Sequence, residues 1–168
     1  MDSRHWLAVL VGMILAGVAL ATLPAPQTLG TFQAWEASSY TDGDKKTCYV
    51  VSSPTGTMPK NVRRGEAYVM VSRRAQRKQD EITIVAGYPY KDESSVRISV
   101  GTSTLVLATA DQFAWSPDVA TSGQVVKAMI SGQEMAVRGV SARGTKTTDT
   151  YSLLGFTAAY NAMANACR

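Results

Sequence analysis

The sequence predicts a mainly β protein: an antiparallel β-sandwich with a short internal helix and a C-terminal helix, preceded by an N-terminal hydrophobic helix. Three observations predict this fold. From residue 31 on, apolar and polar residues alternate in short runs spaced about ten residues apart, which is typical of antiparallel strands. Two later stretches follow a helical period instead. The N-terminus is a long uncharged apolar run.

That apolar run has two interpretations, and both remain open. Trp6 to Leu23 holds no charge and follows Arg4. A cleaved signal peptide needs a short apolar core and a small-x-small exit, which residues 19–21 supply, so that cleavage would fall near Ala21. A membrane-spanning helix needs about 20 apolar residues, which the run also approaches. Residues 1–23 are therefore predicted to be a signal peptide or a retained membrane anchor.

The flanking residues indicate how the chain would be oriented and divided. Positive charge before the run places the N-terminus in the cytoplasm and the rest of the chain outside it, in the periplasm. Small residues recur every four positions along the run, a spacing that permits close helix packing in a bilayer. This predicted helix-packing face is Ala8, Gly12 and Ala16. The proline-containing stretch 24–30 is predicted to be a linker, and 31–168 a β-sandwich domain.

Charge and histidine content limit the function. The 168-residue chain carries a net charge of +4, spread along the sequence, so we expect no nucleic-acid binding. Its one histidine, His5, precedes the apolar run, so the domain lacks histidine for triad catalysis, metal ligation or proton transfer near pH 7. No carboxylate pair or activated nucleophile stands in a recognisable spacing. We therefore expect a protein that is not an enzyme and holds no cofactor or metal.

The two cysteines predict a disulfide. Export leads to an oxidising compartment, where thiols pair. Cys48 and Cys167 are the only cysteines, so one intramolecular bond is possible, and it would tie the C-terminus to an early strand. No C-x-x-C motif is present, so a thioredoxin-like activity is not expected.

The predicted strands follow one another in short runs. They span 31–38, 46–52, 66–73, 81–88, 95–101, 103–109, 134–142 and 145–153. The alternation places Cys48 and Val50, Val69 and Val71, and Val96, Ile98 and Val100 on inward faces. The last two runs form a hairpin through an Arg143–Gly144 turn, with Arg143 and Asp149 as a candidate surface ion pair.

Two segments are predicted to be helical. The stretch 123–132 has Val126, Met129 and Ile130 at helical spacing and ends at Gly132. The C-terminal segment, with Ser152 as its N-cap, carries one apolar stripe. This stripe is Phe156, Tyr160, Met163 and Cys167. Because the cysteine lies on the stripe, the helix should face the strand that carries Cys48.

Two surface regions are candidates for binding a partner. The densest charge, in 72–81, is either a basic rim for an acidic partner or a solvated hairpin loop, and the loop is favoured. Two tyrosines around Pro89 are either exposed binding aromatics or rings packed at the edge of the sandwich, and packing is favoured. The candidate residues are Arg73, Arg74, Arg77, Lys78, Tyr88 and Tyr90. Trp115 is expected to be buried under the sandwich.

Several motifs together resemble a known family. The carrying pieces are Trp35, "CYV" at 48–50, "YVMVSRR" at 68–74, "GYPY" at 87–90, "FAW" at 113–115 and "KAMISGQEMAVRGVSARGTKTTDTYSLLGFTAA" at 127–159, with a final cysteine. They resemble the invasion-associated locus B family of exported alphaproteobacterial proteins. The resemblance implies a periplasmic or envelope β-sandwich without an enzymatic activity. Members often have a further cysteine pair, which this chain lacks.

The leading hypothesis is a non-catalytic envelope domain that binds another envelope or inner-membrane protein. A retained helix would make it an accessory subunit of an inner-membrane complex. The alternative is a soluble secreted or outer-membrane-associated factor that contributes to host-cell invasion, a role that the resemblance implies for some members.

Overall fold

The computed structural model describes residues 25–77 and 79–168. The N-terminal run with Ala8, Gly12 and Ala16 lies outside these ranges, and so does Lys78. The elements are β1 (Gln27–Phe32), β2 (Trp35–Asp42), β3 (Lys45–Ser52), β4 (Gly56–Met58), β5 (Tyr68–Arg74), β6 (Asp80–Val85), β7 (Ser95–Val100), β8 (Ser103–Ala110), β9 (Phe113–Trp115), α1 (Val119–Ser131), β10 (Glu134–Val140), β11 (Lys146–Ser152) and α2 (Phe156–Ala166). Neither of the helices in these ranges has the length and apolar content needed to cross a membrane.

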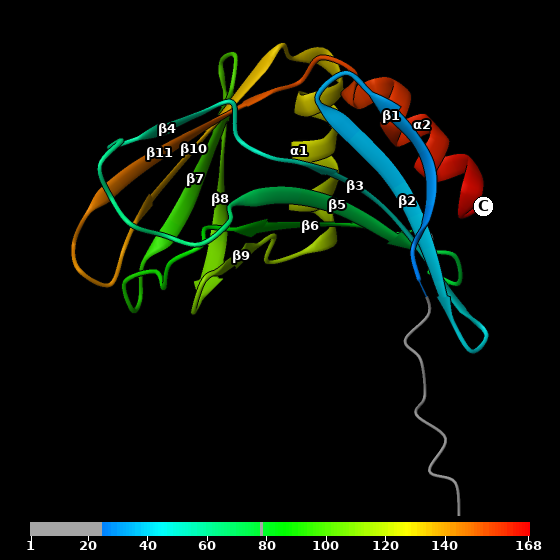
Figure 1. The fold of residues 1–168 in the computed structure, drawn as a ribbon, viewed down its shortest axis with the longest axis horizontal. Coiled ribbons are helices and arrows are strands. Elements are labelled where there is room, and N and C mark those ends of the chain that lie inside the picture. Colours follow the sequence, from blue (N-terminus) through cyan, green and yellow to red (C-terminus); the bar gives the residue numbers. More distant parts are fainter. Residues whose placement is uncertain (1–24, 78) are drawn as a thin grey trace, which may run out of the picture.

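The described strands form one antiparallel sheet, in the order β1-β2-β3-β5-β6-β9-β8-β7-β10-β11-β4. The three-residue β9 lies in the middle and pairs with β6 on one side and β8 on the other. The sheet is strongly curved, and both helices pack against its inner face (Figure 1). The mainly β antiparallel prediction is confirmed, but the two-sheet sandwich is corrected to a single curved sheet. Alternation shows which residues face the core, whereas the pairing of β9 decides whether the two halves share hydrogen bonds.

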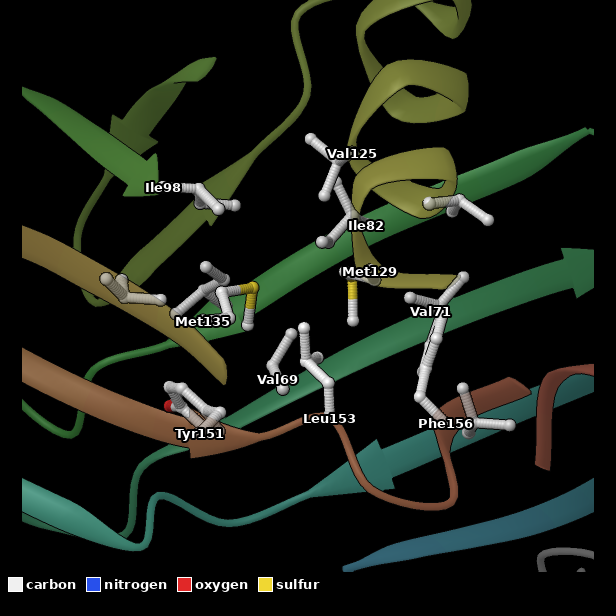
Figure 2. Packing of buried hydrophobic residues seen from close by; sticks show 14 of the residues in the cluster. Val69, Val71, Ile82, Ile98, Val125, Met129, Met135, Tyr151, Leu153 and Phe156 are labelled. Atoms are coloured by element: carbon white, nitrogen blue, oxygen red, sulfur yellow. The ribbon is translucent and has the colours of Figure 1, made fainter. Parts of the chain in front are cut away.

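The inner face carries the predicted alternation. Val69 and Val71 of β5 are buried there together with Ile82 of β6. Met129 of α1 and Phe156 of α2 reach the same cluster from the two helices (Figure 2). The strands and helices therefore share one hydrophobic core, whose burial supplies the main favourable contribution to folding.

Helix α1 ends where the sequence predicted and begins several residues before the predicted start. Its C-cap is Gly132, where a Cβ would collide with the Val100 side chain. Its N-cap is Asp118, whose carboxylate accepts a hydrogen bond from the Thr121 backbone N–H at 2.7 Å. That hydrogen bond lowers the pKa of Asp118 below its ordinary value. The predicted helix 123–132 therefore gains one more turn at its N-terminal end.

Helix α2 begins at Phe156 rather than just after Ser152, so the predicted N-cap is wrong. Gly155 occupies the cap in the left-handed conformation at φ +88°, and no side chain caps the helix. A Cβ at this position would collide with the Phe32 carbonyl group, so the approach of the β1 end requires glycine. The predicted stripe is confirmed, because Phe156, Met163 and Cys167 are buried.

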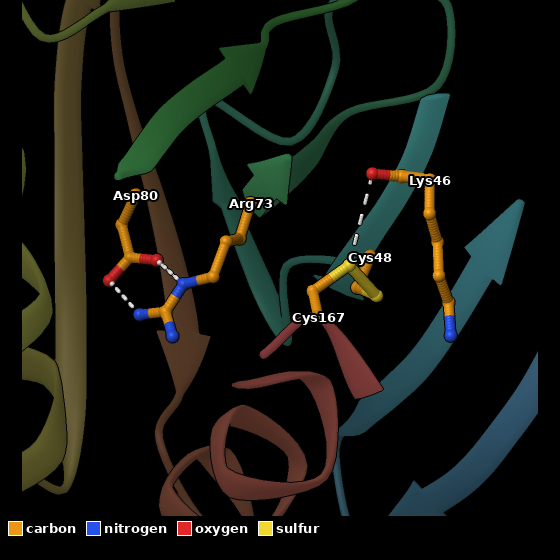
Figure 3. Close-up of a disulfide and its surroundings, with 5 residues drawn as sticks. All are labelled: Lys46, Cys48, Arg73, Asp80 and Cys167. Carbon is orange, nitrogen blue, oxygen red and sulfur yellow. Dashed lines mark hydrogen bonds and ion pairs between the residues drawn. A yellow bond between two sulfur atoms is a disulfide. The ribbon is translucent and has the colours of Figure 1, made fainter. Parts of the chain in front are cut away.

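The predicted disulfide is confirmed. Cys48 of β3 is bonded to Cys167 at the C-cap of α2, and both residues are buried (Figure 3). Helix α2 packs against β1, β2 and β3, so the bond fastens it to the strands that it covers.

Two local predictions have different outcomes. The β10–β11 hairpin turns at Arg143 and Gly144, with Gly144 at φ +83°, as predicted. The predicted linker 24–30 is shorter than expected, because β1 already begins at Gln27 and pairs with β2.

Candidate functional site

The residues predicted as a partner-binding surface do not form one surface in the structure. Tyr88 and Tyr90 are 9% and 4% exposed, which supports packed rings rather than exposed aromatics. They form an edge-to-face pair with 5.3 Å between ring centres. Their neighbour Gly139 makes room for them, since a Cβ there would come within 2.6 Å of the Tyr90 ring. These two tyrosines are therefore part of the core.

A buried ion pair lies beside these rings. The Arg64 guanidinium donates two hydrogen bonds to the carboxylate of Asp149, at 2.9 and 2.6 Å, and lies over the Tyr88 ring at 5.8 Å. Both side chains are nearly enclosed, with 11% and 4% exposed. The hydrogen bonds with Asp149 raise the pKa of Arg64, which keeps it charged. The predicted surface pair of Arg143 with Asp149 is therefore wrong, because Asp149 faces inward and is bound by Arg64.

This ion pair fixes a loop rather than forming a ligand site. Arg64 belongs to the segment between β4 and β5, whereas Asp149 belongs to β11 in the other half of the sheet. The next residue, Gly65, donates its N–H to the carbonyl of Gly87 at 2.8 Å. The hollow that Arg64 shares with Tyr88 and Thr147 has a volume of about 10 Å³, the space of one water molecule at most. A second hollow, which Arg64 lines together with Thr57 and Glu66, has a volume of about 360 Å³. On the side of the tyrosine rings, therefore, the ion pair leaves no room for a ligand.

One buried hydroxyl in this region is unpaired. Tyr151 is fully buried, its hydroxyl has no hydrogen-bond partner among the described residues, and burial raises its pKa. By contrast, the Tyr88 hydroxyl hydrogen-bonds Thr147. We expect Tyr151→Phe to raise the free energy of unfolding by up to about 1 kcal/mol and Tyr88→Phe to lower it by about as much. Urea unfolding measures both, and equal losses in the two variants would contradict the assignment.

Arg73 also has a structural role. Its guanidinium binds the Asp80 carboxylate at 2.8 and 2.9 Å (Figure 3) and donates to the Tyr160 hydroxyl at 2.9 Å. The Tyr160 hydroxyl donates in turn to Asp80 at 2.6 Å. This network joins the β5–β6 hairpin to α2 close to the disulfide. Arg73 is therefore held within the molecule.

A hollow of about 800 Å³ lies on the outward face of β2, β3, β5 and β6, the face that points away from the helices. We call it the outer groove. Its floor is formed by half-buried or exposed apolar and aromatic side chains at alternate positions of these strands. They are Tyr40, Tyr49, Val51, Tyr68 and Met70. The strand register places Val51 opposite Met70, while the rings of Tyr40 and Tyr49 lie 6.4 Å apart.

The groove is not among the predicted sites, although the sequence holds a signal for it. In "CYVV" at 48–51 and "YVMV" at 68–71, both sets of alternate residues are apolar. In a strand with one face in water, apolar residues normally alternate with polar ones, whereas a strand covered on both faces is apolar throughout. Over these four-residue stretches, the outward face of β3 and β5 is therefore less polar than a strand face in water normally is.

Of the predicted surface residues, Arg74 lies in the groove and Arg77 lies beside it. Arg74 lines it and also lines a neighbouring hollow of about 480 Å³, to which Arg77 contributes. Arg74 is 52% exposed and approaches Glu81 only at 3.9 Å. These two arginines are thus available to a partner, unlike Arg73.

The outward face continues onto β9. Trp115 lies opposite Thr83 of β6 and is 39% exposed, so the prediction of a buried Trp115 is wrong. Its neighbour Phe113 is 41% exposed. The physical reason is alternation: Ala114 takes the inward position of this short strand and is fully buried. Aromatic surface therefore extends beyond the groove toward the bend of the sheet.

These features define a β domain with an apolar groove on its outward face. Within residues 25–77 and 79–168, no three histidine, cysteine or acidic residues are grouped closely enough to hold a metal ion. A sequence model of the invasion associated locus B (IalB) protein family matches residues 35–164, and the chain belongs to this family. Family membership indicates an exported protein of the envelope or a secreted one, in agreement with the disulfide. Searches among curated proteins and solved structures gave no match.

Proposed function

We propose that this protein is a non-catalytic, protein-binding domain of the cell envelope and that its partner covers the outer groove. The observation that carries the proposal is the apolar part of the outward face, Tyr49 and Val51 of β3 beside Tyr68 and Met70 of β5, because a sheet face open to water is normally polar. Covering that face would remove apolar surface from water, which is worth about 25 cal/mol per Å².

The short connection between the predicted anchor and the groove supports a partner in the inner membrane. Pro26 lines the groove, and the predicted anchor ends at Leu23. Three residues span at most about 10 Å. If the helix is retained, the groove is held close to the periplasmic membrane surface, where an accessory subunit would meet an integral membrane protein. The alternative, a secreted factor, requires cleavage near Ala21, and the intact mass of the native protein distinguishes the two.

The groove can be tested by removing its apolar floor. We expect Tyr49→Ser combined with Met70→Thr to cost under about 1 kcal/mol of stability, because both side chains face outward. The variant should nevertheless lose co-purification of the native partner in mild detergent, by at least about tenfold, since apolar and aromatic residues at the centre of an interface dominate affinity. Quantitative mass spectrometry of the full chain purified from its own host measures this ratio.

Ile130→Gln is the matched control. Ile130 is 43% exposed on α1, which packs against the other face of the sheet. Its replacement removes a similar apolar group and should leave co-purification unchanged. A groove variant that is folded and retains the same partners as the wild type would refute the proposed function.

A further inference from the structure

We propose that the outer groove binds an extended, proline-rich segment that also carries arginine or lysine, in the polyproline II conformation. The inference rests on the proposed function, since it names the chemistry of the partner at the same groove.

The backbone of the sheet excludes one common way of binding an extended chain. A peptide can add as a strand only at a free sheet edge. β3 is paired with β2 and β5, and β5 is paired with β3 and β6, so the groove lies over strands whose two edges are occupied. A ligand must therefore be recognised through the side chains of the floor.

Those side chains suit a polyproline II helix. This conformation makes no internal hydrogen bonds and presents its carbonyl groups and proline rings outward, and aromatic-lined grooves recognise it. Tyr40, Tyr49 and Tyr68 supply aromatic faces, and each hydroxyl can donate one hydrogen bond to a ligand carbonyl. Val51 and Met70 lie between them and can pack against proline rings.

One proline of the chain itself lies in this groove. Pro26, from the sequence "LPAP" at 23–26, is among the residues that line it. One proline of the chain itself therefore already lies in the groove beside β1, and a proline-rich partner segment would continue along the remaining floor.

The charge of the residues that line the outer groove indicates which side chains the ligand should carry besides its prolines. Asp42, Glu66 and Glu81 line the groove against a single arginine, Arg74, so its charge is negative on a protein whose net charge is positive. A basic side chain between the prolines would be attracted, whereas an anionic lipid surface would be repelled. We therefore favour a basic proline-rich segment over lipid headgroups.

The test titrates the full chain in detergent with fluorescently labelled synthetic peptides and follows anisotropy. The probe is a short peptide of prolines interrupted by two arginines. One comparison peptide keeps the arginines and replaces the prolines with glycine and serine, and another contains prolines alone. We expect the probe to bind at least about tenfold more tightly than the glycine–serine peptide, because a preformed helix loses less conformational entropy.

Variants locate the binding and separate its causes. The double variant Tyr49→Ser with Met70→Thr should bind the probe at least about tenfold more weakly than the wild type, whereas Ile130→Gln should bind it with unchanged affinity. Asp42→Asn with Glu81→Gln should weaken the arginine-containing probe and leave the all-proline peptide unaffected.

Three results would overturn the inference: equal binding of the glycine–serine peptide, binding that survives the loss of Tyr49 and Met70, or no binding of the probe at millimolar concentration. Capture of anionic phospholipid vesicles by wild type, but not by the groove variant, would assign the groove to lipid instead. If the probe fails while the groove variant still loses its native partner, the inference is wrong and the proposed function stands. If the groove variant keeps its partner, both fail.

Discussion

Replacing both cysteines with alanine is expected to lower the free energy of unfolding by about 4 kcal/mol, because the bond between Cys48 and Cys167 closes a loop of nearly the whole domain. The two cysteines are 119 residues apart in the sequence, and a crosslink that closes a loop of that length strongly restricts the unfolded chain. Because Cys167 ends α2, the helix should also be the first element to lose hydrogen-exchange protection. Equilibrium urea unfolding and amide exchange of the full chain measure the two effects.

Reduction of the wild type supplies the control for the disulfide. Wild-type protein unfolded in the presence of a thiol reductant should match the double alanine variant, since both lack the crosslink. Alkylation gives a direct check, because in the native protein neither sulfur should react before denaturation and reduction. Full alkylation of both thiols in native, unreduced protein would show that the bond is absent.

The second large effect is expected from Arg64→Met, which should destabilise the protein by about 3–5 kcal/mol. The substitution leaves the Asp149 carboxylate buried without its partner, and a single uncompensated buried charge is costly. It also releases the segment before β5 from the far half of the sheet. Urea unfolding of the variant and its wild type measures the loss.

A double substitution distinguishes the cost of an orphaned charge from the loss of packing. Arg64→Met with Asp149→Leu removes both charges and keeps apolar groups in their place, so it should be clearly more stable than Arg64→Met alone. If the double variant were as unstable as the sum of the two single variants, the two side chains would not act as a pair. Arg63→Met, at an exposed neighbour of Arg64, should change stability by under about 0.5 kcal/mol.

The buried ion pair went unpredicted because it joins segments far apart in sequence. Arg64 and Asp149 are separated by 85 positions, and nothing local marks them as partners. Asp149 was expected in a surface ion pair, whereas it shares the buried alternate positions of β11 with Thr147 and Tyr151. The groove was missed for a different reason, since the apolar alternate residues of β3 and β5 were interpreted only as strand formers.

Features that depend on local periodicity or on compartment were determined by the sequence alone. The period of two determined which side chains of β5, β6 and β7 enter the core, and the period of 3.6 determined the stripe of α2. Two cysteines in an exported chain left one intramolecular pairing. Whether the strands form two sheets or one, and which distant side chain binds Asp149, were decided only by the tertiary structure. Both depend on contacts between segments far apart in the chain, such as the pairing of β9 with β6 and β8, and no residue's immediate neighbours carry that information.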